Sequence, residues 1–198
     1  LGAVTAVFLV ALVGALARRR GWLPGGADGP LMDLVVRVLY PALILDTILG
    51  NPRLAHPSDM LLPPLFGAAS ILAGFGLAAA LAHFPPLRAA LPSRAERRTF
   101  ALATGLYNYA YLPIPLAQLI FDGATLGVLF VFNLGTEVVL WTAGVLLLTG
   151  GAGRDSWKRA LNPPSLAVAL GLGLNLLGAD TLVPAALRRA LTMLGQCA

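Results

Sequence analysis

The chain contains few charged residues. Charged side chains make up 12% of its 198 residues and hydrophobic ones 58%, whereas about a quarter of the residues in an ordinary soluble domain are charged. So few charges cannot cover a chain of this length with a water-compatible surface. The composition therefore excludes an ordinary soluble domain and predicts a protein whose solvent is lipid.

Cysteine and histidine are almost absent as well. Cys197 is the single cysteine, which excludes an intrachain disulfide and a CxxC metal site. The two histidines, His56 and His83, lie far apart near the ends of apolar runs, and no HExxH, GxSxG or P-loop motif occurs. The sequence offers neither a metal site nor a catalytic site, so we do not expect an enzyme.

Apolar runs dominate what is present. A membrane-spanning helix needs about 20 apolar residues to cross about 30 Å of hydrocarbon. The runs that meet or approach this length cover residues 1–17, 31–49, 60–84, 100–121, 126–148 and 163–177, and 182–198 resembles the start of another. We therefore expect an all-α membrane protein, with a first five-span unit over residues 1–150 and an incomplete second unit over 151–198. Because Leu1 is not Met and already lies inside a run, a fragment of a longer chain is expected. Gly67 and Gly74 in the third run predict close approach of a neighbouring helix.

The basic residues indicate how the chain crosses the membrane. Ten of them lie in the loops after the first, third and fifth runs, against three after the second, fourth and sixth. Cytoplasmic loops carry the excess of Lys and Arg, so the loops 18–30, 85–99 and 150–162 are predicted to be cytoplasmic and the N-terminus to lie outside the inner or plasma membrane. The net charge of +5 follows this topological pattern, and we expect no nucleic-acid partner.

The fourth run contains two prolines, Pro113 and Pro115, near its middle. Proline has no N–H, so the helical partners of the Tyr109 and Tyr111 carbonyls are missing. Broken backbone is tolerated inside a membrane only where it lines a cavity or is buried in protein. We expect the helix to break here, with the first N–H groups of the new half-helix, from Ile114 onward, pointing into the gap and able to hold an anion. A simple proline kink is the alternative.

Three polar residues share one face of the fifth run. Asn133, Glu137 and Trp141 are spaced four residues apart, and a carboxylate at mid-membrane usually faces a cavity or a partner. Glu137 is therefore a candidate for coupling a proton or another cation to transport, with Asn133 beside it. The alternatives are a protonated Glu137 that bonds a neighbouring helix and an Asn133 used for packing. Asp46, near the end of the second run, reads as a carboxylate that reaches out to water.

Five segments carry a resemblance to a known family. They follow the family's order along nearly the whole chain, and the fourth-run stretch and the Asn-Pro-Pro motif are the more specific ones. The segments are Arg18-Arg19-Arg20-Gly21-Trp22-Leu23, Leu39-Tyr40-Pro41-Ala42-Leu43-Ile44, Tyr107-Asn108-Tyr109-Ala110-Tyr111-Leu112-Pro113-Ile114-Pro115-Leu116, Trp141-Thr142-Ala143-Gly144-Val145-Leu146 and Leu161-Asn162-Pro163-Pro164. In these segments the chain resembles the auxin efflux carrier family of membrane transporters, which includes PIN-type auxin exporters and malonate or malate permeases.

The resemblance implies ten spans in two inverted five-helix repeats. The broken fourth and ninth spans would cross at mid-membrane and hold an organic anion. The residues expected to bind it are Asn108, Tyr109, Tyr111, Pro113, Ile114 and Pro115. The chain departs from the family pattern by carrying Tyr at 107, 109 and 111 in place of smaller residues, and by ending before a second crossover. A faint similarity between the first and sixth runs agrees with an inverted second copy.

The function expected is secondary active transport, by efflux or uptake, of a small organic anion such as a carboxylate or auxin-like acid. The expected partners are this anion and the lipid bilayer, with a homodimer as an open alternative. H⁺ or Na⁺ is the candidate coupling ion, and no other cofactor is expected. A membrane-embedded sensor or scaffold without transport activity is the alternative function, while the lack of a nucleophile–base pair disfavours an intramembrane enzyme.

Overall fold

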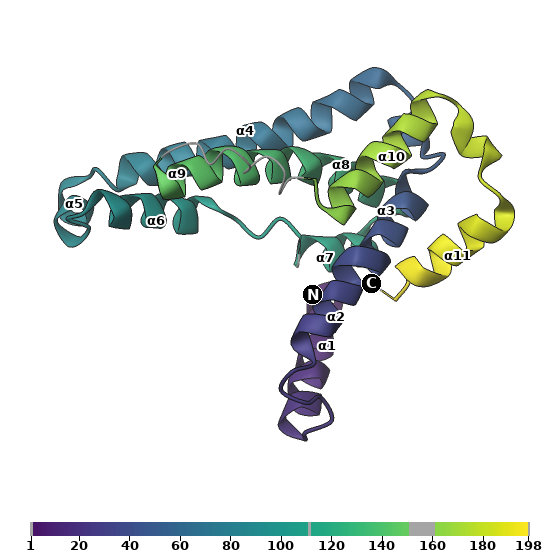
Figure 1. The fold of residues 1–198 in the computed structure, drawn as a ribbon, viewed down its shortest axis with the longest axis horizontal. Helices are drawn as coiled ribbons and strands as arrows, with labels where there is room; N and C mark the ends of the chain where they lie inside the picture. Colours follow the sequence, from purple (N-terminus) through teal and green to yellow (C-terminus); the bar gives the residue numbers. More distant parts are fainter. Residues whose placement is uncertain (1, 111, 151–160, 198) are drawn as a thin grey trace.

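The computed structural model describes residues 2–110, 112–150 and 161–197. Over these residues the protein is helical and contains no strand (Figure 1), in agreement with the predicted all-α class. The helices are α1 (Gly2–Arg19), α2 (Asp28–Leu34), α3 (Tyr40–Ile48), α4 (Pro57–Leu81), α5 (Pro85–Ala90), α6 (Arg94–Gly105), α7 (Pro113–Ile120), α8 (Gly123–Val139), α9 (Val145–Thr149), α10 (Pro163–Leu176) and α11 (Ala185–Gly195). By length and composition, two helical stretches of the described residues could cross a membrane: Pro57–Leu81 with 25 residues and Gly123–Thr149 with 27.

Two of the predicted runs contain a π-helical turn. Val35–Leu39 joins α2 to α3, and Leu140–Gly144 joins α8 to α9. A π-turn inserts one extra residue into a helix and frequently marks a functional site. The first of these turns lies immediately before Pro41, whose ring would meet the carbonyl of Arg37 in a regular helix. The wider turn therefore lets the helix continue through the proline.

Glycine brings α4 close to α6 and α8. A Cβ on Gly74 would lie 2.4 Å from the carbonyl oxygen of Gly105, and one on Gly67 would lie 2.1 Å from that of Phe132. Neither position can hold a larger residue without separating the helices. The close approach predicted from Gly67 and Gly74 is thus confirmed, and Figure 1 shows α4 running alongside α6, α8 and α9.

The buried apolar residues form two clusters. The larger one joins α3, α7, α8 and α10 and includes Ile44, Ile48, Ile114, Val131 and Val168. The smaller one joins α4 to the end of α8 and consists of Ile71, Phe75 and Val139, with Leu102 and Leu106 packed against them. Both clusters use α8, so this helix connects the two halves of the interior.

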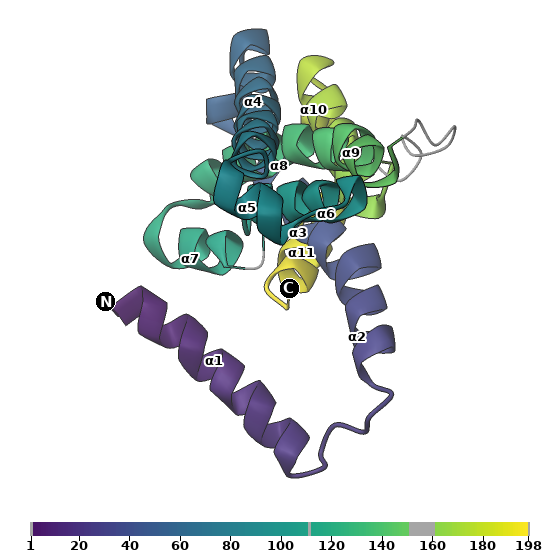
Figure 2. The same cartoon turned by 90° about the vertical axis from the view of Figure 1, so that its left-hand side faces the viewer.

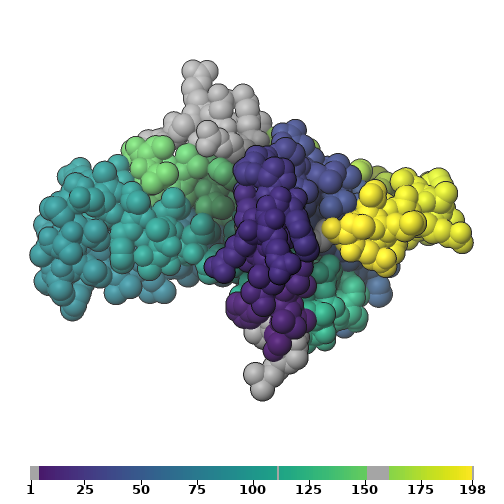
Figure 3. Space-filling view, turned by 90° about the horizontal axis from the view of Figure 1, so that it is seen from below, coloured from purple at the N-terminus to yellow at the C-terminus, as the bar shows by residue number. Residues whose placement is uncertain are grey.

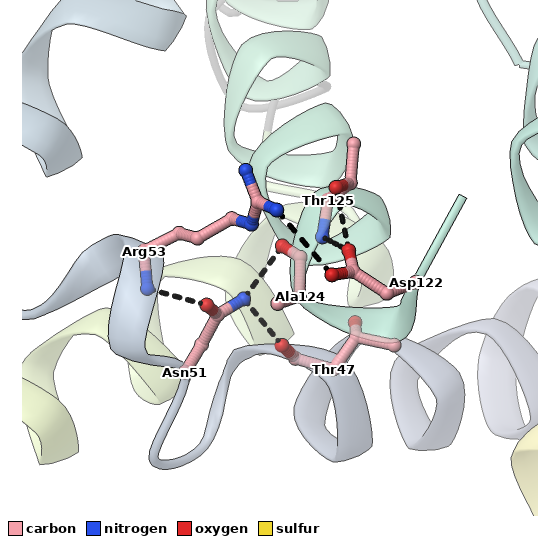
Figure 4. Close-up of polar contacts among 6 residues, drawn as sticks. All are labelled: Thr47, Asn51, Arg53, Asp122, Ala124 and Thr125. Carbon is pink, nitrogen blue, oxygen red and sulfur yellow. Dashed lines mark hydrogen bonds and ion pairs between the residues drawn. The ribbon is translucent and has the colours of Figure 1, made fainter.

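A polar cluster ties the turn after α3 to the start of α8 (Figure 4). The side-chain amide of Asn51, a buried residue, donates to the carbonyls of Thr47 and Ala124 at 2.9 and 2.8 Å. Beside it, Asp122 caps α8 by accepting from the backbone N–H of Thr125 at 2.8 Å. Hydrogen bonds from the Thr125 hydroxyl and N–H, with the nearby Arg53 guanidinium, hold the pKa of Asp122 below its usual value.

The first and last helices lie at the edge of the molecule. α1 projects away from the other helices and contacts α7 (Figure 2). Seen from below, α1 crosses the middle of the face, with the α4–α6 end on one side and α11 on the other (Figure 3). Its apolar side chains are exposed, with Phe8 at 63% and Val10 at 73%, as expected for a surface whose solvent is lipid.

α11 packs against α3 through a polar contact. The hydroxyl of Thr192 donates to a carboxylate oxygen of Asp46 at 2.6 Å, and Asp46 is half-buried. The prediction that Asp46 reaches out to water holds only in part, because α11 covers one side of a carboxylate that is otherwise accessible. A partner more than a hundred residues away in the sequence leaves no local signal.

Candidate functional site

The fourth apolar run is broken, as its prolines predict. α6 ends at Gly105, α7 begins at Pro113, and residues 106–110 between them are not helical. The N–H of Leu106 closes α6 with a bond to the carbonyl of Leu102 at 3.0 Å. Tyr111, which was expected to bind substrate, lies outside the described residues.

Asn133 satisfies the carbonyl that Pro113 leaves without a helical partner. Its Nδ2 donates to the backbone oxygen of Tyr109 at 3.0 Å. The oxygen of a peptide group can only accept, so the amide nitrogen of Asn133 must face it and the orientation of the side chain is settled. Asn133 is 7% exposed, and its Oδ1 is buried without a hydrogen-bond partner among the described residues.

The N–H groups at the start of α7 are already in use. Ile114 donates to the carbonyl of Ala110 at 3.0 Å, and Leu116 donates to that of Leu112 at 3.3 Å. The prediction that these two donors point freely into the gap is therefore wrong: a short non-helical segment still supplies acceptors for the first turn. Ile114 is buried in the larger apolar cluster, so its place is in the wall of the site.

The side-chain amide nitrogen of Asn108 can supply the donors that the bonded N–H groups at the start of α7 cannot. Its Oδ1 accepts from the N–H of Leu112 at 3.4 Å, which leaves both Nδ2 hydrogens for other partners. Asn108 is exposed, and no acceptor in the described part of the chain bonds its Nδ2. Within the described residues, the two Nδ2 hydrogens of Asn108 are therefore available to a ligand.

A cavity of about 590 Å³ opens beside the break. Apolar side chains form much of its wall, including Ile44, Ile114, Phe130 and Val168 of the larger buried cluster. Its polar groups converge from several regions of the chain. They are Tyr40 on α3, Tyr107, Asn108 and Tyr109 in the break, Asn133 and Glu137 on α8, Trp141 in the turn after α8, and Asn162 and Ser165 at the start of α10. An apolar cavity with a few converging polar groups is the usual form of a small-molecule site.

Both π-helical turns contribute to this cavity. Val36 lies in the turn before α3, and Leu140 and Trp141 lie in the turn after α8. Because a π-turn rotates the residues that follow it relative to a regular helix, it changes which side chains face the cavity.

Glu137 is the most heavily bonded polar group in the wall. Its Oε1 accepts from the hydroxyl of Tyr109 at 2.9 Å, and its Oε2 accepts from Trp141 Nε1 at 3.0 Å and Asn162 Nδ2 at 2.7 Å. Two donors thus meet Oε2 and one meets Oε1. Among the described residues of the wall, Glu137 is the sole Asp, Glu, Lys, Arg or His.

The second tyrosine of the break has a different partner. The hydroxyl of Tyr107 lies 2.7 Å from that of Ser70 on α4 and 3.5 Å from that of Thr136. The rings of Tyr107 and Tyr109 meet edge to face, with centroids 6.5 Å apart. Both tyrosines line the cavity because the segment that carries them is not helical.

Sequence reasoning placed most of these residues but missed the contribution of α10. Asn133, Glu137 and Trp141 share the cavity face of one helix, as their spacing predicted. Asn162 was noticed as part of a motif and not as a partner of Glu137. Its position before two prolines, with Ser165 three residues later, is a helix-start signal, and its Oδ1 does accept the N–H of Ser165 at 2.9 Å.

Metal chemistry gains no support from the described ranges. No three His, Cys, Asp or Glu side chains among residues 2–110, 112–150 and 161–197 come together as a group that could hold a metal ion.

Comparison with known proteins places the chain in a family. The family model described as "Membrane transport protein" matches residues 1–156. No curated protein and no solved structure matches the chain. The matched segment contains the broken helix, its two prolines and the polar face of α8. The chain belongs to the membrane transport protein family, which is the auxin efflux carrier family of transporters.

Proposed function

We propose that the protein is a secondary active transporter of a small organic anion, such as a carboxylate or an auxin-like acid. The observation that carries this proposal is the cavity of about 590 Å³ beside the helix break, with the amide donors of Asn108, which bond no acceptor among the described residues, at its edge. Membrane transport of a small solute follows from the family, and the class of solute is the proposed step.

Asn108 is the group proposed to hold the carboxylate. An anion needs donors, and the described cavity wall offers no Lys, Arg or His. The Nδ2 of Asn108 has two hydrogens to offer, and its Oδ1 is anchored by Leu112. The apolar wall formed by residues such as Phe130 and Val168 supports an organic body attached to the carboxylate.

Glu137 and Asn133 are proposed to couple an ion, with H⁺ as the favoured candidate. Glu137 is the ionisable carboxylate in the wall, and Asn133 links it through one helix face to the break. Of the other residues expected to bind substrate, Pro113 and Pro115 act indirectly, because they end the helix and open the cavity.

The architecture proposed around this site is an inverted repeat. Residues 1–150 would form the first five-span unit and residues 151–198 would begin the second, with the N-terminus outside and the Arg-rich loops in the cytoplasm. The contact between Asn162 on α10 and Glu137 on α8 supports a site that uses both units.

Counterflow in proteoliposomes tests the proposal. The intact protein is reconstituted and loaded with unlabelled carboxylate, and exchange is followed for a panel of labelled carboxylates and auxin-like acids. We expect Asn108→Ala to abolish exchange without unfolding the protein. Gln118→Ala, an exposed position on α7 outside the cavity wall, is the matched control and should exchange normally. Normal flux in Asn108→Ala would exclude this binding site.

A further inference from the structure

The two oxygens of the Glu137 carboxylate have chemically different partners. Oε2 faces the indole N–H of Trp141 and the amide of Asn162, while Oε1 faces the hydroxyl of Tyr109. The Asn162 amide cannot turn around, because its Oδ1 is held by the backbone N–H of Ser165 at 2.9 Å. Both partners of Oε2 can therefore only donate.

This difference decides where a proton can bind. A proton on Oε2 would face two N–H groups, neither of which can accept it. A proton on Oε1 faces a hydroxyl, which can either donate or accept. Tyr109 is consequently the partner that has to respond when Glu137 becomes protonated.

We propose that Tyr109 couples protonation of Glu137 to binding of the anion, an inference that rests on the proposed transport function. The proton forms a covalent bond to Oε1 of Glu137. The Tyr109 hydroxyl then rotates about its C–O bond, accepts a hydrogen bond from the new O–H, and turns its own hydrogen toward the cavity. No other covalent bond forms or breaks. One event removes a negative charge from the wall and adds a donor for a carboxylate.

In the part of the chain that the structure describes, no other ionisable side chain of the cavity wall competes for this role. The titratable residues that line the cavity with Glu137 are Tyr40, Tyr107 and Tyr109. α8 packs against α3, the 3-10 turn Pro52–Leu54, α4, α7 and α10, and α7 and α10 carry no charged residue. The charged residues on or next to the remaining packed elements are Asp33, Arg37, Asp46, Arg53 and Asp59, and none belongs to the wall.

Tyr109 is well placed to pass this change to the break. Its carbonyl accepts from Asn133 and its hydroxyl donates to Glu137, so two residues one turn apart on α8 hold the same residue of the broken segment. Coupling between two ligands is reciprocal: if the proton favours the anion, the anion must favour the proton to the same extent. The anion would then cross with one proton, and a monocarboxylate would move without net charge.

The apparent affinity for labelled malonate and labelled indole-3-acetate, measured by counterflow between pH 5.5 and 8, tests this role. In the wild type we expect the affinity to rise as the pH falls, by at most about tenfold per pH unit for one proton. Glu137→Gln, whose amide resembles the protonated acid, should bind tightly at every pH. At low pH, Tyr109→Phe should bind the anion about tenfold more weakly than the wild type, since a hydrogen bond to a charged group is removed.

Tyr107→Phe is the matched control, because its hydroxyl bonds Ser70 and not Glu137. It removes a hydroxyl from the same cavity wall, so its overall affinity is expected to differ from that of the wild type, but the change in affinity per pH unit should not. Thermal unfolding in detergent checks that each variant is folded. A Tyr109→Phe profile identical to that of the wild type, beside a flat Glu137→Gln profile, would overturn the role of Tyr109 and leave the transport function intact. Absence of exchange of both probes by the wild type at every pH would overturn both.

Discussion

Asn133 donates a hydrogen bond to the carbonyl of Tyr109 across 3.0 Å, at the place where Pro113 has no N–H to offer. A side chain from α8 thus replaces the missing helical partner of a residue 24 positions earlier in the chain. The broken segment is not loose backbone, because its freed acceptor has a buried, oriented donor. Because of this hydrogen bond, the cavity can exist without an unpaired carbonyl at Tyr109.

The replacement can be tested by restoring the original donor. In Pro113→Ala, residue 113 regains an N–H that can reach the carbonyl of Tyr109, since Ile114 already donates to Ala110 in helical register. Asn133→Leu should lower the free energy of unfolding of the wild type by about 1–3 kcal/mol. Added to the Pro113→Ala variant, the same change should cost clearly less, because residue 113 then supplies the donor. Thermal unfolding of the two single variants and the double variant in detergent gives the coupling energy. Strictly additive effects would show that Asn133 does not stand in for the proline.

The close packing of α4 and α6 predicts opposite effects at two nearby glycines. Gly74→Ala places a methyl group 2.4 Å from the carbonyl oxygen of Gly105, so we expect a loss of about 1–3 kcal/mol. Gly76→Ala on the same helix meets nothing within 4 Å and should gain up to about 1 kcal/mol from helix propensity. Unfolding midpoints in detergent distinguish the two. Equal shifts would mean that the helices do not approach as described.

The contact between Asn162 and Glu137 predicts sensitivity to charge. Asn162→Asp keeps a helix-capping side chain but puts a second carboxylate at the position now 2.7 Å from Glu137 Oε2. Asn162→Ser also keeps a cap and adds no charge. We expect the Asp variant to be less stable than the Ser variant by about 1–3 kcal/mol at neutral pH, because two like charges would share the site. The difference should shrink in acid as one carboxyl takes up a proton. No difference at neutral pH would contradict the contact.

Asp122 predicts part of the acid sensitivity of the fold. Hydrogen bonds from Thr125, helped by Arg53, lower its folded-state pKa, so the unfolded chain binds the proton more readily. Its stabilising contribution is therefore complete above the ordinary Asp pKa of about 3.9 and is lost as the pH falls through the lower folded value. Asp122→Asn retains the cap and should flatten the loss of thermal stability on this acidic flank. A slope in Asp122→Asn equal to that of the wild type would refute the prediction.

Local sequence patterns were sufficient for the features that depend on near neighbours. Two prolines in one apolar run predicted the break, because each removes a donor at a known place. The four-residue spacing of Asn133, Glu137 and Trp141 predicted their shared face, since 3.6 residues make one helical turn. Gly67 and Gly74 predicted close helix contacts because glycine has no side chain, which can be read directly from the sequence.

Other features depend on which distant segments meet. The half-helix was expected to keep its donors for a ligand, but the carbonyls of Ala110 and Leu112 take them. Asp46 was expected to face water alone, but Thr192 of α11 bonds one of its carboxylate oxygens and leaves it half-buried. The role of Asn162 beside Glu137 joins residues 25 positions apart. Sequence spacing could not predict these pairs, because hydrogen-bond partners are selected by distances that arise when helices pack.

The amino-acid sequence by itself determined that the chain is helical, apolar and interrupted at Pro113 and Pro115, because composition and missing N–H groups act locally. Only the tertiary structure decided how the interruption is stabilised and which side chains face the resulting cavity. The packing of α8 and α10 against the broken segment brings Asn133 within hydrogen-bond distance of the Tyr109 carbonyl. It also places three donors around Glu137. A polar group inside an apolar protein must find its partner in space, and the order of residues along the chain does not specify where that partner lies.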